Sequence, residues 1–325
     1  MGQFLSNCSV DSIIIAAQAL KDGSLVVFPT ETVYGLGADA TSEKAVARIY
    51  EVKGRPSDHP LIVHIADLKY LDKWISEIPE FAILLARNFW PGPMTLILKR
   101  SQLAKDFITG GQETVGIRIP DNSLALGLLE AFHKIGGSGV AAPSANRFGQ
   151  VSPTTAAAAQ EELGQFLNSS DLILDGGSSE IGLESTIIDC TSELPRILRP
   201  GAITIAMIER ATGLSVTENH KVDQTTEQIR ISGSLENHYA PNASVILDQE
   251  PLPGTGFIAL AEVETPDGSI RLASPKSIEE FAQVLYSALR KGDRQNLASI
   301  YIAQPTGDGL AIAIRDRLLR AAGGR

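Results

Sequence analysis

The sequence predicts a layered α/β protein built in two parts. Short apolar runs with strand character alternate with segments of helical spacing through residues 1–213, which is typical of a sheet flanked by helices. The alternation stops near Gly213, gives way to a polar stretch and then resumes. A chain of 325 residues is also long for a single hydrophobic core. We therefore expect a first domain over 1–213, a linker or lid over 214–243 and a small second α/β domain over 244–325.

Start and stop signals define the first helices and strands. Residues 9–23 are expected to form a helix, because Ser9 can cap its first turn and Gly23 can end it. The apolar run LVVFP, residues 25–29, is expected to be a buried strand. Residues 42–54 should form the next helix, because apolar side chains recur there at helical spacing. The same criteria predict strands over 61–65, 94–99, 115–119, 139–143, 172–175 and 185–189, and helices over 67–75, 79–89, 121–135 and 154–167.

The second part repeats the alternation on a smaller scale. Strands are expected over 256–263 and 297–303, and helices over 277–291 and 308–322. The polar stretch before them is typical of a linker. Its segment SGSLENHYAP, which ends at Pro241, nevertheless carries more reactive side chains than a spacer requires.

Charge and composition exclude several classes of protein. The net charge of −10 opposes a sequence-independent nucleic-acid binder, which needs a basic face, so no direct nucleic-acid partner is expected. Cys8 and Cys190 are the two cysteines, which excludes a disulfide framework and fits a reducing cytoplasm. No apolar run approaches the roughly 18 residues of a membrane span, so no membrane contact is expected. The five histidines lack metal-ligand spacing, and we predict no metal ligands.

Four basic residues are candidates for binding phosphate or carboxylate groups. The chain has neither a Walker A sequence nor a convincing G-x-G-x-x-G after a first strand, so side chains would have to hold phosphates. Lys53 and Arg55 lie at a helix end, whereas Arg118 lies within a strand and Arg199 within LRPG. Each of them alone could instead be an ordinary surface charge. Arg118 fits a surface position least, because an unpaired guanidinium within the apolar pattern VGIRIP would be costly to bury.

Hydroxyl side chains lie where predicted strands begin or end. Ser144 follows one strand within APSAN, Ser185 opens another within LESTIID, and Thr32 follows the strand at 25–29. Donors at the carboxyl ends of strands commonly bind ligands in α/β proteins, although a plain turn, a strand start or a capping loop would use the same residue types. His64 lies in a strand, where a histidine is often a satisfied core residue.

The sequence favours chemistry without a covalent protein nucleophile. No serine or cysteine lies in a G-x-S-x-G elbow. The cations and hydroxyls together describe a pocket for a phosphorylated nucleotide and a small polar second substrate.

Five motifs follow one another in a fixed order: PTETVYGLG (29–37), KGRPSDHPLIVH (53–64), APSAN (142–146), LESTIID (183–189) and LRPG (198–201). Taken together, they resemble the threonylcarbamoyl-AMP synthases, a YrdC-like family, over about the first 210 residues. The HYAP segment and the C-terminal unit are similar to the long form of that family. The resemblance implies a YrdC-like twisted mixed sheet with flanking helices, plus a small Rossmann-like α/β C-terminal domain.

The resemblance also implies an enzyme, a nucleotidyltransferase of the L-threonylcarbamoyladenylate synthase type. ATP, L-threonine and bicarbonate would be converted to threonylcarbamoyl-AMP and pyrophosphate, with Mg²⁺ accompanying ATP. The product would pass to a tRNA-modifying threonylcarbamoyltransferase for threonylcarbamoyladenosine (t6A) synthesis. Threonine would contact Thr32, His64, Arg118 and Ser185. The nucleotide would contact Lys53, Arg55, His59, Thr114, Ala142, Ser144, Ser152, Arg199 and Tyr239, and Lys53, Arg55 and Arg118 would act in catalysis.

Two positions depart from the family pattern. His59 stands where the family commonly has Asn, and the linker reads SGSLEN where the family commonly begins with Pro-Gly and carries basic residues.

The implied chemistry agrees with the residues. A carbamate formed from the threonine amine is already an anionic oxygen nucleophile, so it needs positioning and charge neutralisation rather than a serine or cysteine. Two alternatives differ in class: an RNA-binding protein without catalysis, and an enzyme that uses carbamoyl phosphate. The acidic balance counts against the first, and the lack of acylphosphatase-like and zinc-finger segments counts against the second.

Overall fold

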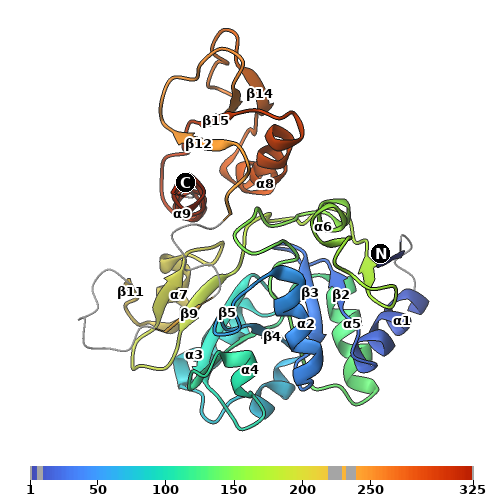
Figure 1. Ribbon diagram of the computed structural model, residues 1–325. Helices are drawn as coiled ribbons and strands as arrows, with labels where there is room; N and C mark the ends of the chain where they lie inside the picture. Colours follow the sequence, from blue (N-terminus) through green and yellow to red (C-terminus); the bar gives the residue numbers. More distant parts are fainter. Residues whose placement is uncertain (1, 6–9, 219–228, 232–238, 324–325) are drawn as a thin grey trace.

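The computed structural model describes residues 2–5, 10–218, 229–231 and 239–323. Within them the chain forms two sheets, each with packed helices (Figure 1). The expected helix cap Ser9 and most of the expected linker, residues 219–228 and 232–238, lie outside the described residues, so those expectations stay predictions.

The first 218 residues supply the large sheet and the helices that cover it. The strands are β1 (Gln3–Leu5), β2 (Val26–Phe28), β3 (Gly35–Asp39), β4 (Ile62–His64), β5 (Met94–Lys99), β6 (Thr114–Arg118), β7 (Val140–Ala141), β8 (Leu172–Leu174), β9 (Thr186–Asp189), β10 (Arg196–Arg199) and β11 (Thr217–Glu218). The helices are α1 (Val10–Lys21), α2 (Glu43–Lys53), α3 (Glu80–Phe89), α4 (Asp106–Thr109), α5 (Ser123–Lys134), α6 (Ala156–Leu163) and α7 (Ile205–Thr212), with a 3-10 helix η1 (Leu68–Lys73).

The large sheet is mixed, as predicted. Its strand order is β1-β8-β2-β3-β7-β4-β6-β5-β9-β10-β11. Strand β6 pairs with β4 in parallel and with β5 antiparallel. The parallel register sets His64 directly beside Arg118, at the last residue of each strand. Two predicted site residues are therefore neighbours because of sheet pairing alone.

The alternation of side chains along β2 divides the core between the two faces of the sheet. Val26 and Phe28 pack with residues of α1 and α5. Val27, between them, packs in a larger cluster with residues of α2 and α3. Because successive side chains of a strand point to opposite faces, α1 and α5 cover one face, and α2 and α3 cover the other. Figure 1 shows the sheet between these helices.

The C-terminal unit is a second, all-parallel sheet with two long helices. Its elements are β12 (Ser244–Leu247), β13 (Gly256–Ile258), β14 (Ile270–Ala273), α8 (Ile278–Arg294), β15 (Ser299–Ile302) and α9 (Leu310–Ala322). The strand order is β12-β15-β13-β14, and every neighbouring pair is parallel. Helix α8 joins β14 to β15, and a parallel sheet with packed helices matches the expected small α/β unit.

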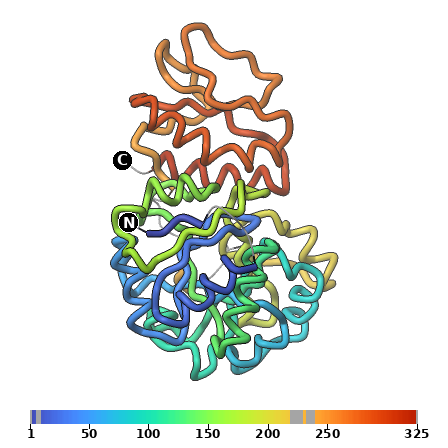
Figure 2. Tube along the Cα trace, turned by 90° about the vertical axis from the view of Figure 1, so that its right-hand side faces the viewer, coloured from blue at the N-terminus to red at the C-terminus, as the bar shows by residue number. Residues whose placement is uncertain are grey.

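The C-terminal unit packs directly on the first part of the chain (Figure 2). Its core cluster, which includes Phe281 and Leu285, also contains Leu183 and Val151 of the first part. Gly182 marks how close the two parts approach, because a Cβ there would lie 2.6 Å from the carbonyl oxygen of Ala282 in α8. A side chain at this position would therefore push the two parts from one another.

Strand β3 differs from the sequence expectation, which leaves its residues in the loop that begins at PTET. Gly35 and Gly37 lower the strand propensity of this segment. The structure needs a glycine at Gly37, because a Cβ there would lie 2.8 Å from Val140 Cγ1 and 2.9 Å from the Phe28 ring. Close packing between strands decides this element, and the sequence pattern does not carry that information.

Other elements are shorter, longer or additional compared with the prediction. The segment expected as a helix over 67–75 is the 3-10 helix η1. Additional elements that the sequence pattern does not predict are β1, α4, β10, α7, β11, β12 and β14. Several of these are edge strands or short helices, whose formation depends on pairing with neighbours rather than on local propensity.

Candidate functional site

A pocket opens where the ends of β4, β6 and β10 meet the loops before β3, after β7 and before β9. The cavity measures about 50 Å³. Its side facing the C-terminal unit is formed by Tyr239 and Glu184. It is lined by Thr30, Thr32, Val33, Tyr34, Gly35, Arg55, Ile62, His64, Arg118, Ala142, Pro143, Ser144, Glu184, Ser185, Arg199 and Tyr239.

The PTET segment forms a compact turn around the Thr30 hydroxyl. Thr30 Oγ1 lies 2.8 Å from Thr32 Oγ1 and donates to the Val33 carbonyl oxygen at 2.6 Å. It also accepts from the backbone N–H groups of Thr32 and Val33, each at 3.2 Å. Both threonines are buried in the pocket lining. The turn therefore holds the Thr32 hydroxyl in one place, as a hydrogen-bonding group for a ligand requires.

Arg118 has the buried partner that its sequence context demands. Its Nη2 donates to Glu31 Oε1 at 2.6 Å, and the two side chains are only 6% and 4% exposed. Glu31 comes from the PTET segment, so this ion pair ties β6 to the loop that carries Thr32. A charge buried without such a partner would be strongly unfavourable.

His64 contributes a neutral ring to the pocket. Burial first, and then the positive charge of Arg118, lower the pKa of His64 to about 3. The imidazole is therefore uncharged at pH 7, and it can take part in hydrogen bonds without adding to the positive charge of the pocket.

Arg199 is directed at Ser185. Its Nε and Nη2 donate to the Ser185 carbonyl oxygen at 3.0 and 2.9 Å, and Nη2 also donates to Ser185 Oγ at 3.1 Å. The same hydroxyl lies 2.8 Å from Thr95 Oγ1 on β5. Burial lowers the pKa of Arg199 from its ordinary value, yet an arginine remains a cation at neutral pH. A cation and an oriented hydroxyl thus share one wall of the pocket.

Lys53 anchors the APSAN loop. Its Nζ donates to the carbonyl oxygen of Ser144 at 2.6 Å and to that of Asn146. Burial, followed by the charge of Arg55, lowers the pKa of Lys53 well below its ordinary value. Through these hydrogen bonds the Lys53 amino group supports the loop that presents Ser144, and Lys53 is not part of the described pocket lining.

Arg55 and His59 share one aromatic neighbour. The Arg55 guanidinium lies 5.8 Å from the ring centroid of Phe148, and the His59 ring meets the same ring edge-on at 5.4 Å. Arg55 Nη2 also donates to the Pro60 carbonyl oxygen at 3.0 Å. Burial lowers the pKa of Arg55 to about 10, so it stays charged at pH 7. Arg55 lines the pocket, whereas His59 is absent from the described lining.

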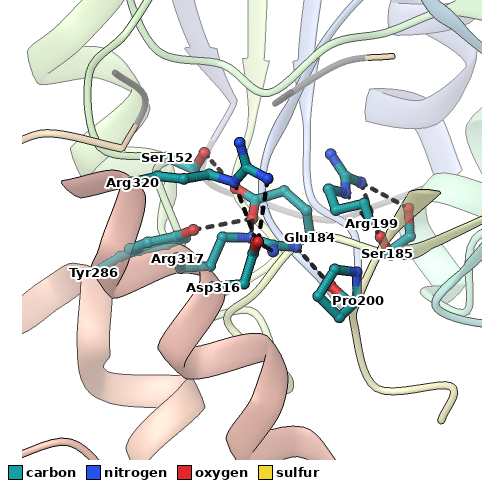
Figure 3. Close-up of polar contacts among 9 residues, drawn as sticks. All are labelled: Ser152, Glu184, Ser185, Arg199, Pro200, Tyr286, Asp316, Arg317 and Arg320. Carbon is teal, nitrogen blue, oxygen red and sulfur yellow. Dashed lines mark hydrogen bonds and ion pairs between the residues drawn. The ribbon is translucent and has the colours of Figure 1, made fainter. Parts of the chain in front are cut away.

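Ser152 contacts the pocket indirectly, through the carboxylate of Glu184. Its Oγ donates to Glu184 Oε1 at 2.6 Å, and both residues are buried. Glu184 Oε2 accepts from Tyr286 Oη and from Arg317 Nε, each at 2.9 Å (Figure 3). Burial alone would raise the pKa of Glu184, but the charges of Arg317 and Arg199 and the Ser152 hydrogen bond lower it to about 2. The group is a fixed anion at neutral pH.

Tyr239 closes the pocket from the side of the C-terminal unit. Its ring stacks on Tyr286 at 5.9 Å between centroids, and the Arg317 guanidinium lies 5.3 Å from its centroid. The side chain is 1% exposed, and burial raises its pKa. Its backbone φ of 65° lies in the left-handed region, which is uncommon for a residue other than glycine.

The structure brings most of the sequence-predicted residues into one pocket. Those in its lining are Thr32, Arg55, His64, Arg118, Ala142, Ser144, Ser185, Arg199 and Tyr239. Lys53, His59, Thr114 and Ser152 are outside that lining. Thr114 begins β6, four residues before Arg118, which corresponds to about 13 Å along a strand.

Three important residues escape the sequence argument. Glu31 and Glu184 both lie within quoted motifs, PTET and LEST, so an acidic residue among hydroxyl and apolar residues was the available signal. Arg317 lies on α9, more than a hundred residues further along the chain from Glu184, and it has no local signal at all.

The described part of the chain lacks two kinds of feature. Among the parts of the chain that the structure describes, no group of three or more His, Cys, Asp or Glu side chains could hold a metal ion. No described helix combines the length and the apolar character needed to cross a membrane.

Protein families match the chain in two consecutive parts. Residues 18–201 match the Sua5_yciO_yrdC family, described as "Telomere recombination". Residues 203–323 match a family described as "Threonylcarbamoyl-AMP synthase, C-terminal domain".

Individual relatives match almost the whole chain. The threonylcarbamoyl-AMP synthase of Pyrococcus abyssi is 39% identical over 328 residues, which cover 96% of this chain and 94% of that protein. The Bacillus subtilis protein of the same name is 40% identical over 329 residues, which cover 95% and 92%. The crystal structure of P. abyssi Sua5 complexed with L-threonine matches with a TM-score of 0.86 at 37% identity, over 100% of this chain and 98% of that one.

Proposed function

The chain belongs to the threonylcarbamoyl-AMP synthase family, and on this premise we propose that it condenses L-threonine, bicarbonate and ATP to threonylcarbamoyl-AMP and pyrophosphate. It is thus an L-threonylcarbamoyladenylate synthase, a nucleotidyltransferase that serves t6A modification of tRNA. The observation that carries the proposal is the meeting of three arginines with several hydroxyls in one pocket. That set suits an amino-acid carboxylate and a polyphosphate together.

We assign the threonine side of the pocket to the ends of β4 and β6. Arg118 would bind the threonine carboxylate with the part of its guanidinium that Glu31 does not occupy. His64, Thr32 and Ser185 would bind the polar groups of the substrate, His64 as an uncharged ring. The solved relative that holds L-threonine supports this choice of ligand.

We assign the nucleotide side to Arg55, Arg199 and the APSAN loop. The two arginines would offset phosphate charge, and Ser144 would donate from a loop that Lys53 anchors. A nucleotide needs more room than the 50 Å³ of the pocket, because drug-sized ligands occupy sites of about 300–1,000 Å³. Nucleotide binding would therefore have to displace side chains of the pocket lining.

The reaction then needs no protein nucleophile. The threonine amine and bicarbonate give a carbamate and water. A carbamate oxygen attacks the α-phosphorus of ATP, the bond to the bridging oxygen of the β-phosphate breaks, and pyrophosphate leaves with that electron pair. The protein contributes orientation and charge neutralisation, which are the main sources of catalysis in phosphoryl-transfer chemistry.

We propose that Mg²⁺ enters as part of the substrate, bound to the phosphates of ATP. The described residues supply no cluster that would hold a resident metal. Glu184, the carboxylate in the described lining, already accepts hydrogen bonds at both oxygens. Magnesium commonly relies on substrate phosphates and water with few protein ligands.

We further propose that the product passes to a tRNA-modifying threonylcarbamoyltransferase in the cytoplasm. A mixed anhydride of a carbamate and a phosphate is labile in water, so a second enzyme must consume it soon after release. The two cysteines and the absence of a disulfide framework in the sequence support a reducing compartment.

Pyrophosphate release tests the proposal. ATP is supplied with L-threonine and bicarbonate, separately and together, and release is measured. We expect release only when all three are present. A folded protein that binds ATP but releases no pyrophosphate under any of these conditions would refute the proposed reaction.

A further inference from the structure

Glu184 is a pocket residue held largely by the C-terminal unit. Tyr286 of α8 and Arg317 of α9 both donate to its Oε2 at 2.9 Å, whereas Ser152 of the first part donates to Oε1 at 2.6 Å. The Arg317 side chain is fully buried, with 0% exposure. Figure 3 shows the two C-terminal side chains reaching Glu184 from their helices, with Ser152 approaching it from the other side.

Arg317 makes a second contact with the pocket wall. Its Nη2 donates to the Pro200 carbonyl oxygen at 3.0 Å. Pro200 follows Arg199, just as Ser185 follows Glu184, so Arg317 joins the two chain segments that carry these residues. Arg199 joins the same two segments through its hydrogen bonds to Ser185 (Figure 3). One wall of the pocket is thus tied together by two arginines, one from each part of the protein.

The two segments have little freedom to separate without loss of contacts. A Cβ at Gly201 would lie 2.4 Å from the backbone nitrogen of Thr186, which shows how closely the backbones pack. A change at Arg317 would therefore act on Arg199 through short, buried contacts rather than through a flexible linker.

We propose that Arg317 is a positioning residue of the nucleotide side of the pocket, which acts by holding Glu184 and the Pro200 carbonyl and so orients Arg199. The assignment of that side to the nucleotide rests on the proposed function. The C-terminal unit is then part of the binding site, although Arg317 itself is absent from the described lining of the pocket.

The test compares Arg317→Met with Arg320→Met in the full chain. Arg320 lies three residues after Arg317 on α9. Its Nη2 donates to Asp316 at 3.1 Å, and Arg317 also contacts Asp316. The probes are ATP and L-threonine, each titrated alone by calorimetry. We expect Arg317→Met to weaken ATP binding by about tenfold and threonine binding by less than about twofold, and Arg320→Met to change neither by more than about twofold.

Two further variants separate positioning from loss of structure. Arg317→Lys keeps the charge but loses the fork that reaches both partners, so its ATP affinity should lie between those of the wild type and Arg317→Met. In a Glu184→Gln background the effect of Arg317→Met on ATP affinity should shrink, because the carboxylate it holds is gone. A variant that only unfolds part of the sample would lower the binding stoichiometry for both ligands equally.

The proposal is overturned if Arg317→Met binds ATP as the wild type does, or if its effect is the same with Glu184 and with Gln at position 184. Where Arg317→Met does not fold, the Glu184→Gln, Arg317→Met double variant replaces it, because it also removes the Glu184 charge that would be left unpaired. Its ATP and threonine titrations are compared with those of Glu184→Gln alone. Equal ATP affinity of the double variant and Glu184→Gln also overturns the proposal. Arg317-dependent ATP binding without pyrophosphate release would keep this inference and refute the proposed reaction.

Discussion

Arg118 and Glu31 form a buried ion pair that joins the end of β6 to the PTET turn, with 2.6 Å between Nη2 and Oε1. The Glu31 carboxylate thus contacts the same arginine that we assign to the threonine carboxylate. Glu31 Oε1 contacts one terminal nitrogen, so the guanidinium retains further donors for a ligand. Glu31 therefore fixes the direction of Arg118 while compensating its charge.

Glu31→Gln should weaken threonine recognition. The amide keeps a hydrogen-bond acceptor for Arg118 but removes the compensating charge, so we expect a loss of about 2 kcal/mol in unfolding free energy. The KM for threonine should rise about fivefold or more, with little change in the KM for ATP. Steady-state kinetics and urea titration measure both, and Glu51→Gln, at an exposed acidic position on α2, is the control. Unchanged threonine KM would show that Glu31 does not orient Arg118.

Arg118→Ala should abolish threonine-dependent pyrophosphate release while ATP binding persists. The substitution removes the proposed carboxylate contact and leaves Glu31 buried without its partner. Because a drop in activity could also come from unfolding, circular dichroism and ATP titration accompany the assay. The Glu31→Gln, Arg118→Ala double variant should regain part of the lost stability but none of the turnover. Recovery of turnover in that variant would contradict the assignment.

His64 makes the stability depend on pH. Its pKa is lowered from 6.5 to about 3 in the folded protein, so folding favours the neutral ring. Its contribution is complete above pH 6.5 and is lost as the pH falls from 6.5 toward 3, since the unfolded chain binds the proton first. At pH 5 about 2 kcal/mol should be lost relative to pH 8.

Urea unfolding of the wild type and of His64→Asn at pH 8 and pH 5 measures this dependence. The variant should lose much less stability between the two values. Glu184 does not interfere, because its lowered pKa costs stability only as the pH falls below 4.5. Equal losses in both proteins would mean that His64 is not held neutral by the fold.

Lys53→Met distinguishes an anchoring role from a catalytic one. In the structure its amino group donates to the carbonyl oxygens of Ser144 and Asn146, so its loss should loosen the loop that presents Ser144. We expect the KM for ATP to rise about tenfold, with kcat changed by less than about threefold. A fall in kcat of about a hundredfold or more, at unchanged KM, would instead support the catalytic role that the family resemblance implies.

Local patterns in the sequence predict the regular parts of the fold well. The helix α2 begins after Ser42, whose hydroxyl accepts from the Ala45 N–H, and ends at Gly54 in the left-handed region. Strand β5 has the predicted bounds. These elements are recoverable because caps, stops and apolar spacing act over a few residues. Strand β3 is different, because its glycines are explained only by the neighbouring strands.

The motifs of the sequence by themselves determined which residue types the pocket contains, since Thr32, Ser144, Ser185 and Arg199 all lie in the five ordered motifs. Only the tertiary structure decided their partners. Arg118 meets Glu31, Lys53 turns to the Ser144 loop, and Glu184 meets Arg317. The physical reason is that a buried polar or charged group needs an opposite charge or a hydrogen-bond partner close to it. The packing of the two sheets and their helices decides which groups lie close, whereas distance along the sequence does not.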